Sequence, residues 1–188
     1  MSKGFTLLEL IIVIGILAVL AAVSVLVLNP AQLFAQARDT TRIQDLAQVS
    51  SAVGLYLSTV NSPTLQGGAG FTCGTNWGTS RSGGSPTKHV AASGATAHSF
   101  VFAVDGTGWV AVPLNASTGG SPLATLPRDP TNDDTYNYQY SCNNTNKTFE
   151  VDAKMESTRY SNGGSDDKES RDGGNDANEY EIGTDLTL

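Results

Sequence analysis

The chain opens with a long apolar segment. Residues 10–28 contain no charged side chain. These nineteen residues would span roughly 28 Å as a helix, close to the thickness of the hydrocarbon core of a bilayer. A secretory signal peptide does not fit, because the run lacks a longer basic region before it and a small-residue cleavage site after it. We therefore predict a membrane-spanning helix in residues 5–29, and Lys3 before it favours a cytoplasmic N-terminus.

Residues 30–60 continue as an amphipathic helix. Apolar side chains recur at helical spacing and predict a face that packs on a soluble domain. These positions are Ile43, Leu46, Val49, Val53, Leu57 and Val60. The charged side chains fall among the polar positions, at Arg38, Asp39, Arg42 and Asp45. Pro30 removes one backbone hydrogen bond, so we predict a kink or a loosened turn there.

A loop is predicted next, in residues 61–98, which are rich in Gly, Ser and Thr. Phe71 and Trp77 are expected to pack near Cys73. The second cysteine, Cys142, lies far away, and the two lack the spacing of a zinc site. In an extracytoplasmic domain we expect a disulfide between them rather than two unpaired thiols. Closing a loop of about 70 residues would stabilise the domain by roughly 4 kcal/mol.

An antiparallel sheet is predicted in residues 99–157. Its strands are expected at 99–104, 109–112, 135–142 and 147–157, the first two as a hairpin. The tyrosines of the third strand are interpreted as core residues rather than a platform for sugars or bases; they are Tyr136, Tyr138 and Tyr140. In the fourth strand, Phe149, Val151, Ala153 and Met155 are predicted to face the core. The alternating residues Glu150, Asp152, Lys154 and Glu156 are predicted to face water.

These patterns predict an α+β fold. A long N-terminal helix, whose first half spans a membrane, packs its second half on a four-stranded antiparallel sheet. Residues 158–188 follow as an acidic C-terminal loop.

The charge of the chain is concentrated at its C-terminal end. The net charge is −7, yet residues 1–149 hold seven acidic and seven basic side chains, whereas residues 150–188 hold eleven and four. The absence of a basic surface argues against nucleic acid as a partner. The two histidines lie in a loop-like region without a nucleophile beside them, so no enzyme activity is predicted. Solvated acidic loops or a cation site remain the candidate roles of the acidic end.

One carboxylate interrupts the apolar N-terminal region. Glu9 stands in the stretch KGFTLLELIIVIG, where a charge costs at least a few kcal/mol near the centre of a bilayer. The sequence MSKG followed by FTLLELIIVIGILAVLAA resembles the N-terminus of type IV pilins and of the pseudopilins of type II secretion systems. A simple membrane anchor would leave Glu9 unexplained.

The resemblance implies processing and assembly. It implies that residues 1–4 form a leader, that prepilin peptidase cuts between Gly4 and Phe5, and that the new amine of Phe5 is methylated. It also implies that Glu9 forms a salt bridge with the Phe5 amine of a neighbouring subunit when the N-terminal helices stack. The implied partners are identical or homologous pilin subunits, prepilin peptidase, an inner-membrane assembly platform and, before assembly, membrane lipid.

The sequence does not decide between the pilins and the pseudopilins. The segment LPRDPTNDDTYNYQY resembles a region of the major pseudopilin and related pilins. A pilus subunit, a major pseudopilin acting as a secretion piston, and a filament-tip binding or adhesion subunit are the alternatives. The presence of Glu9 favours a repeated body subunit, because tip subunits of such filaments often lack this glutamate.

Calcium is the one cofactor that the sequence suggests. Major pseudopilins carry a calcium-binding loop near the C-terminus, and residues 176–178 of this chain resemble part of it, with Asn178 in place of an aspartate. The candidate ligands are Asp166, Asp167, Asp172 and Asp176. The alternative interpretation is a solvated acidic loop without metal. No other cofactor is expected.

Overall fold

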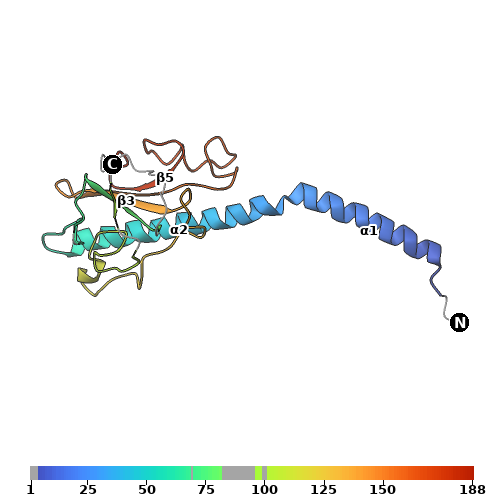
Figure 1. The fold of residues 1–188 in the computed structure, drawn as a ribbon, viewed down its shortest axis with the longest axis horizontal. Coiled ribbons are helices and arrows are strands. Elements are labelled where there is room, and N and C mark those ends of the chain that lie inside the picture. The colour runs from blue at the N-terminus through green and yellow to red at the C-terminus, as the bar shows by residue number, and fades with distance from the viewer. Residues whose placement is uncertain (1–3, 69, 82–95, 99–100) are drawn as a thin grey trace.

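The computed structural model describes residues 4–68, 70–81, 96–98 and 101–188. Helix α1 (Leu7–Leu28) projects from one end of a compact head, and helix α2 (Pro30–Thr59) runs from it into that head (Figure 1). The two helices are separated at Asn29, whose backbone is left-handed with φ 38° and ψ 73°. Pro30 occupies the first position of α2, where a missing N–H costs nothing. The predicted break at Pro30 is therefore present, as a boundary between two helices.

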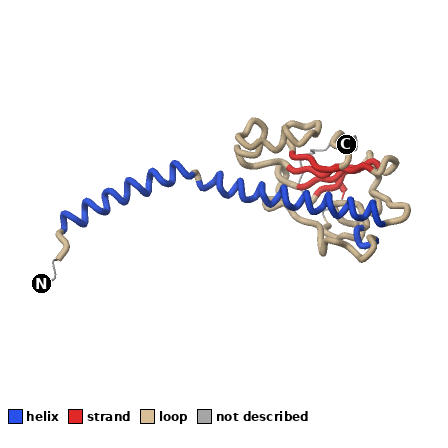
Figure 2. The backbone as a smooth tube through the Cα atoms, turned by 180° about the vertical axis from the view of Figure 1, so that it is seen from behind, coloured by secondary structure: helices blue, strands red, loops and turns tan. Residues whose placement is uncertain are grey.

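One face of α2 packs on the sheet. Leu46, Val49 and Val53 are fully buried in the hydrophobic core, and Tyr56 is 2 % exposed. Leu46, Val49 and Val53 belong to the predicted apolar stripe, to which the structure adds Tyr56, and α2 contacts strands β4 and β5. Figure 2 shows the sheet between α2 on one side and the C-terminal loops on the other.

The sheet has five strands in the order β2-β1-β3-β4-β5. They are β1 (Asn76–Thr79), β2 (Thr96–His98), β3 (Tyr138–Asn143), β4 (Thr148–Ala153) and β5 (Tyr180–Gly183). Strands β1, β3, β4 and β5 form a four-stranded antiparallel sheet, and β2 adds a parallel edge strand to β1. The α+β architecture, with its long N-terminal helix, is confirmed.

Two of the strands lie elsewhere than predicted. The hairpin expected from 99–104 and 109–112 is wrong for the described residues 101–113, which hold no strand and one isolated bridge, between Asp105 and Pro113. Residues 99 and 100 lie outside the described residues. The apolar residues Trp109–Val112 are all 0 % exposed, so this segment passes through the core instead of alternating between core and solvent. It crosses β1 closely, because a Cβ on Gly78 would lie 1.8 Å from the carbonyl oxygen of Trp109. The sheet takes β1 from the predicted loop and β5 from the acidic C-terminal end instead.

The predicted disulfide is present, and both of the aromatic side chains expected near it are buried. Cys73 and Cys142 are bonded across a separation of 69 residues, with their Cα atoms 4.9 Å apart. Phe71 and Trp77 are each 4 % exposed, and the ring of Phe71 lies 5.8 Å from that of Tyr140. The disulfide thus joins the loop that follows α2 to strand β3.

The prediction for the polar face of β4 was wrong. Phe149, Val151 and Ala153 face the core as expected. Glu150 and Asp152, which were expected to face water, are each 1 % exposed. They are buried because the C-terminal segment, residues 158–188, covers the face of the sheet that alternation assigned to solvent (Figure 1).

Candidate processing and assembly site

The N-terminal end of α1 is closed by a capping box. The Oγ1 of Thr6 accepts the amide N–H of Glu9 at 3.2 Å. In return, Oε2 of Glu9 accepts the amide N–H of Thr6 at 2.9 Å and its hydroxyl at 2.8 Å. This reciprocal arrangement satisfies donors at the helix start that have no partner within the helix. Glu9 is therefore held in a defined place by the residue that follows Phe5.

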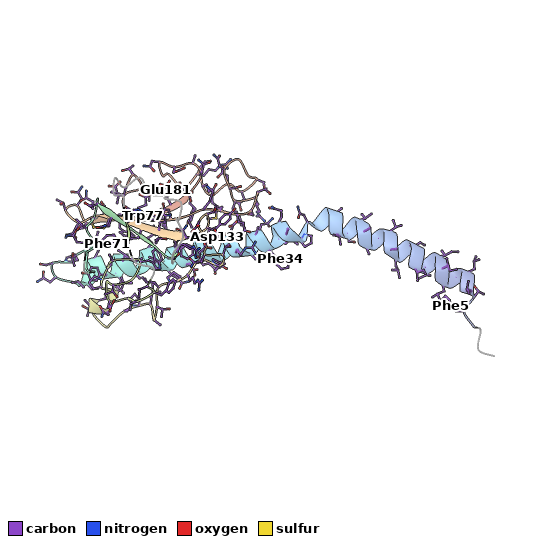
Figure 3. All side chains as sticks on the ribbon, in the orientation of Figure 1. Phe5, Phe34, Phe71, Trp77, Asp133 and Glu181 are labelled. Carbon is purple, nitrogen blue, oxygen red and sulfur yellow. A yellow bond between two sulfur atoms is a disulfide. The ribbon has the colours of Figure 1, made fainter. Side chains whose placement is uncertain are left out.

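The predicted cleavage position lies just outside the helix. Gly4 and Phe5 precede the capping box and have no helical structure, and Phe5 is 79 % exposed (Figure 3). A peptidase needs an accessible peptide bond outside regular secondary structure, and the Gly4–Phe5 bond meets both conditions. The Gly4–Phe5 bond is one residue from Thr6 and four residues from Glu9, so cleavage would create an amine beside the capping box.

Glu9 lacks a cationic partner among the described residues. None of their basic side chains forms an ion pair with it, and none of their donors contacts its second oxygen, Oε1. An ionised carboxylate has about four lone-pair sites, and the capping box uses two. The carboxylate is therefore able to accept a further donor from another molecule.

Helix α1 is long and apolar enough to cross a membrane. Its 22 residues correspond to about 33 Å of helix, and every side chain described in it is exposed. Its one hydroxyl, that of Ser24, donates to the carbonyl of Leu20 at 2.8 Å, which satisfies the polar group within the helix. The helical stretch Leu7–Thr59, which contains α1, is the one membrane-span candidate found in the described part of the chain.

A buried ion cluster fixes α2 to the head. The guanidinium of Arg42 donates to Asp129 from Nε at 2.7 Å and from Nη2 at 3.0 Å, and to Asp39 from Nη1 at 2.8 Å. Arg42 and Asp39 are 0 % exposed, and Asp129 is 2 % exposed. We call these three side chains the Arg42 clamp. The clamp joins α2 to the LPRDP segment.

The clamp extends toward the end of β4. Asp39 accepts the amide N–H groups of Glu156 and Ser157, each at 2.8 Å. Arg38 forms a bidentate ion pair with the Glu156 carboxylate, and this hydrogen bonding lowers the pKa of Glu156 below its usual value. Burial works to lower the pKa of Arg42, but its hydrogen bonds to Asp129 and Asp39 outweigh that effect and raise it. Arg42 therefore stays charged inside the head.

The four candidate calcium ligands each have partners within the protein. Asp166 pairs with Lys168 and Arg159, and the Lys168 contact is the main cause of its lowered pKa. The carboxylate of Asp167 accepts the hydroxyl and amide of Ser170 and the amide of Gly163, which lowers its pKa to about 2.

Asp172 and Asp176 belong to the turn before β5. Asp172 accepts the amides of Gly174 and Glu181 at 2.9 and 2.6 Å, and Asp176 accepts the amide of Asn178 at 2.9 Å. Across the described residues, no three His, Cys, Asp or Glu side chains are already grouped for a metal ion. The prediction that the four aspartates bind calcium stays a prediction.

Buried carboxylates lie under the C-terminal segment. Burial, with a further contribution from its hydrogen bond to Glu181, raises the pKa of Glu150 to about 9. Burial raises the pKa of Glu179 to about 8, although Lys154 lies 3.2 Å from it and acts in the opposite sense. Burial and the nearby Glu150 also raise the pKa of Asp152 well above its usual value. Burial in the folded head therefore favours the protonated, uncharged form of these carboxyl groups at neutral pH.

Comparison with known proteins identifies the N-terminal region. Residues 1–25 match the family model of the prokaryotic N-terminal methylation motif, the prepilin signature of type IV pilins and pseudopilins. No curated protein and no solved structure matches the chain. The resemblance read from residues 1–25 is thus confirmed by the motif match.

Reasoning from the sequence missed two parts of this arrangement. Thr6 was not assigned a role, although Thr-x-x-Glu is the sequence signature of a capping box. The spacing of Asp39 and Arg42 predicted a pair on the helix, but not that the pair would be buried. Its third member, Asp129, comes from a distant segment, and periodicity carries no signal for such a contact.

Proposed function

We propose that this chain is a repeated structural subunit of a type IV pilus-like filament. Prepilin peptidase removes residues 1–4 by cutting between Gly4 and Phe5, and then methylates the Phe5 amine. Before assembly, the subunit lies in the inner membrane with its N-terminus in the cytoplasm and its head outside. An assembly platform then moves it into a filament, where α1 of each subunit packs against α1 of its neighbours.

Glu9 is the observation that carries this proposal. Its carboxylate has an open oxygen, Oε1, and no cation among the described residues. An unperturbed α-amino group titrates near pH 8, so the processed Phe5 is largely charged at neutral pH. In a medium of low dielectric, an opposite charge at contact distance offsets much of the desolvation of both groups. The amine of a neighbouring Phe5 therefore gives Glu9 its best partner only when two subunits stack in register.

The experiment compares Glu9→Ala and Glu9→Gln with the natural chain. We expect both variants to be processed normally, seen as the mass that corresponds to loss of residues 1–4 and gain of one methyl group. Both should form few or no filaments, because even the isosteric glutamine lacks the charge. As a matched control, Ile12→Ala also removes side-chain volume from α1 but should retain filaments. Normal filament yield from Glu9→Gln would refute the pairing.

The major pseudopilin of a secretion system is the second candidate. The observation that favours it is the LPRDP segment, whose Asp129 binds Arg42 in the head. A secretion piston and a surface pilus would use the same membrane helix and the same amine–Glu9 pairing. Deletion of the gene separates them: loss of surface filaments supports the pilus, and loss of an exported protein with filaments intact supports the piston.

A further inference from the structure

The solvent-facing side of α2 is uncharged. Exposed positions recur every three or four residues from Leu33 to Ser58, so they form one stripe along the helix, which we call the outer stripe. No charged residue stands among the exposed positions of α2, a helix that the structure describes throughout. All four charged side chains of α2 bond to groups of the head instead; they are Arg38, Asp39, Arg42 and Asp45. The exposed face of a helix in a soluble domain normally carries charge, so the outer stripe is suited to another environment.

The hydroxyl groups of the outer stripe are satisfied within the helix. They donate to backbone carbonyls of the preceding turn at 2.8 to 3.2 Å, and they belong to Thr40, Thr41, Ser51 and Ser58. A hydroxyl that is bonded within its own helix can be covered by another molecule without losing a hydrogen bond. Because the stripe also lacks charge, covering it carries little desolvation penalty. The outer stripe can therefore be buried in an interface.

A groove lies along the part of the outer stripe that is furthest from α1. It has a volume of about 440 Å³ and is lined by α2 on one side and by a loop of the head on the other. Ala52 and Leu55 contribute apolar surface from α2, and Pro122 and Leu123 contribute it from the loop. We call it the α2 groove. Leu55 is 41 % exposed, so an apolar part of the groove faces water in the isolated subunit.

Phe34 is an exposed aromatic side chain at the opposite end of the same stripe. Outside residues 5–28, the described part of the chain exposes four large apolar side chains, which are Leu33, Phe34, Leu55 and Val101. Three of the four belong to the outer stripe. Phe34 is 66 % exposed and lies near the point where α2 leaves the head (Figure 3). Burial of its ring against an apolar surface would be favourable.

Phe34 cannot fill the α2 groove of its own subunit. Helix α2 is continuous from Pro30 to Thr59, and the seventeen positions from Phe34 to Ser51 of the groove correspond to about 26 Å of helix. Membrane lipid can cover Phe34, which lies six residues beyond the end of α1, but it cannot reach a groove about 26 Å further along α2. A second copy of the chain can cover both surfaces, because it carries both the aromatic side chain and the groove.

We propose that Phe34 of one subunit inserts into the α2 groove of another. This contact presupposes a filament, the proposed function, and adds a second contact to the pairing of Phe5 with Glu9. Phe5 and Glu9 are four residues apart, about 6 Å of helix, whereas Phe34 and the groove are about 26 Å apart. The groove contact therefore joins subunits that lie further apart along the filament. Because its two surfaces differ, the contact is heterologous and repeats without end unless the rotation closes a ring.

Cysteine cross-linking of assembled filaments tests this contact. In parallel subunits offset by seventeen residues, Ala37 of one lies beside Gly54 of the other, and both positions are exposed. A Cβ on Gly54 would meet no atom of the described residues within 4 Å, and the two native cysteines are bonded to each other. Filaments of the double variant Ala37→Cys and Gly54→Cys, treated with a short bismaleimide, should give a ladder of linked multimers on a denaturing gel.

The matched control combines Ala37→Cys with Asn175→Cys. Asn175 is exposed and belongs to the C-terminal segment, which lies across the sheet from α2 (Figure 2). The same treatment should leave this control monomeric, because the groove contact does not bring the two thiols together.

The yield of filaments gives an independent measurement. Phe34→Ala should lower it about tenfold or more, because the substitution removes a ring that is buried only in the filament. Leu55→Gln, which makes the groove more polar, should lower it as well. The control Val101→Ala also truncates an exposed apolar side chain but should retain the natural yield. Phe34→Ala should be processed normally and keep the natural Tm, since Phe34 is mostly exposed in the isolated subunit.

The outcomes separate this contact from the proposed function. A ladder from the Ala37–Gly54 pair alone, with few filaments from Phe34→Ala, supports it. Monomeric chains in treated filaments of that pair, an equal ladder from the Asn175 control, or a natural yield from Phe34→Ala overturns the groove contact and leaves the filament function standing. If the double variant does not assemble, the yield from Phe34→Ala decides. If the natural chain forms no filaments, the filament function is wrong and the groove contact with it.

Discussion

Replacement of Arg42 by methionine should destabilise the head strongly. The substitution keeps much of the side-chain volume but removes the cation shared by Asp39 and Asp129. Those two carboxylates are almost completely buried, so water cannot take the place of the guanidinium. Breaking a buried ion pair by removing one partner costs about 3–5 kcal/mol.

The structure places the cost at the lower end of that range. After the substitution, Asp39 still accepts two backbone amides, those of Glu156 and Ser157. Asp129 still accepts the amides of Thr131 and Asn132 at 2.8 and 3.0 Å. Because each carboxylate keeps two donors, we expect a loss of about 3 kcal/mol, or about 6–12 °C in Tm for a head of this size.

Denaturant unfolding of the detergent-solubilised chain, followed by tryptophan fluorescence, measures this loss. Arg38→Ala is the matched control, because its ion pair with Glu156 is partly exposed and should contribute under about 1 kcal/mol. Adding Asp39→Asn and Asp129→Asn to Arg42→Met should recover part of the loss, since no buried charge then remains unpaired. A single Arg42→Met variant within about 1 kcal/mol of the natural chain would refute the reasoning.

Three further predictions concern the disulfide, the buried acids and the helix cap. Replacing Cys73 and Cys142 together by serine should lower the free energy of unfolding by about 4 kcal/mol, as measured by denaturant titration without reductant, because the bond closes a loop across 69 residues. In chelator, the free energy of unfolding of the head should fall by at least about 2 kcal/mol between pH 5 and pH 8. The folded-state pKa values of Glu150 (about 9) and Glu179 (about 8) lie above the unfolded value. Protonation of these two groups therefore stabilises the fold at low pH, and this stabilisation is lost as the pH rises. Thermal unfolding at a series of pH values checks this, and stability that is flat or rising over that window would contradict it. Thr6→Val should reduce filament yield, because it removes the hydroxyl partner of Glu9 and about 1 kcal/mol of capping, whereas Thr6→Ser should not.

The helices and part of the sheet could be predicted because their patterns are local. The apolar run, the period of Leu46, Val49 and Val53, and the alternation in β4 each depend on neighbours within a few residues. The disulfide followed from the number of cysteines and the expected compartment. The same local information identified Glu9 as a residue in need of a partner.

The errors have a common physical cause. Residues 109–112 do not alternate between apolar and polar side chains as a half-buried strand would. Their burial on all sides depends on contacts with β1 and with the distant Pro127 carbonyl, which accepts a hydrogen bond from the Trp109 indole at 3.0 Å. Glu150 and Asp152 alternate like solvent-facing residues, but the C-terminal segment, residues 158–188, covers them. Tertiary contacts between distant segments do not change the pattern of apolar and polar residues within either segment, so that pattern cannot predict them.

The most direct test of the account is a density map of the assembled filament that resolves the N-terminal helices. The account predicts that the chain begins at Phe5 and that the Phe5 amine lies within about 4 Å of the Glu9 carboxylate of an adjoining subunit, the distance of an ion pair. A filament in which residues 1–4 are retained, or in which each Glu9 lies more than about 10 Å from every Phe5 amine, beyond effective pairing, would contradict it.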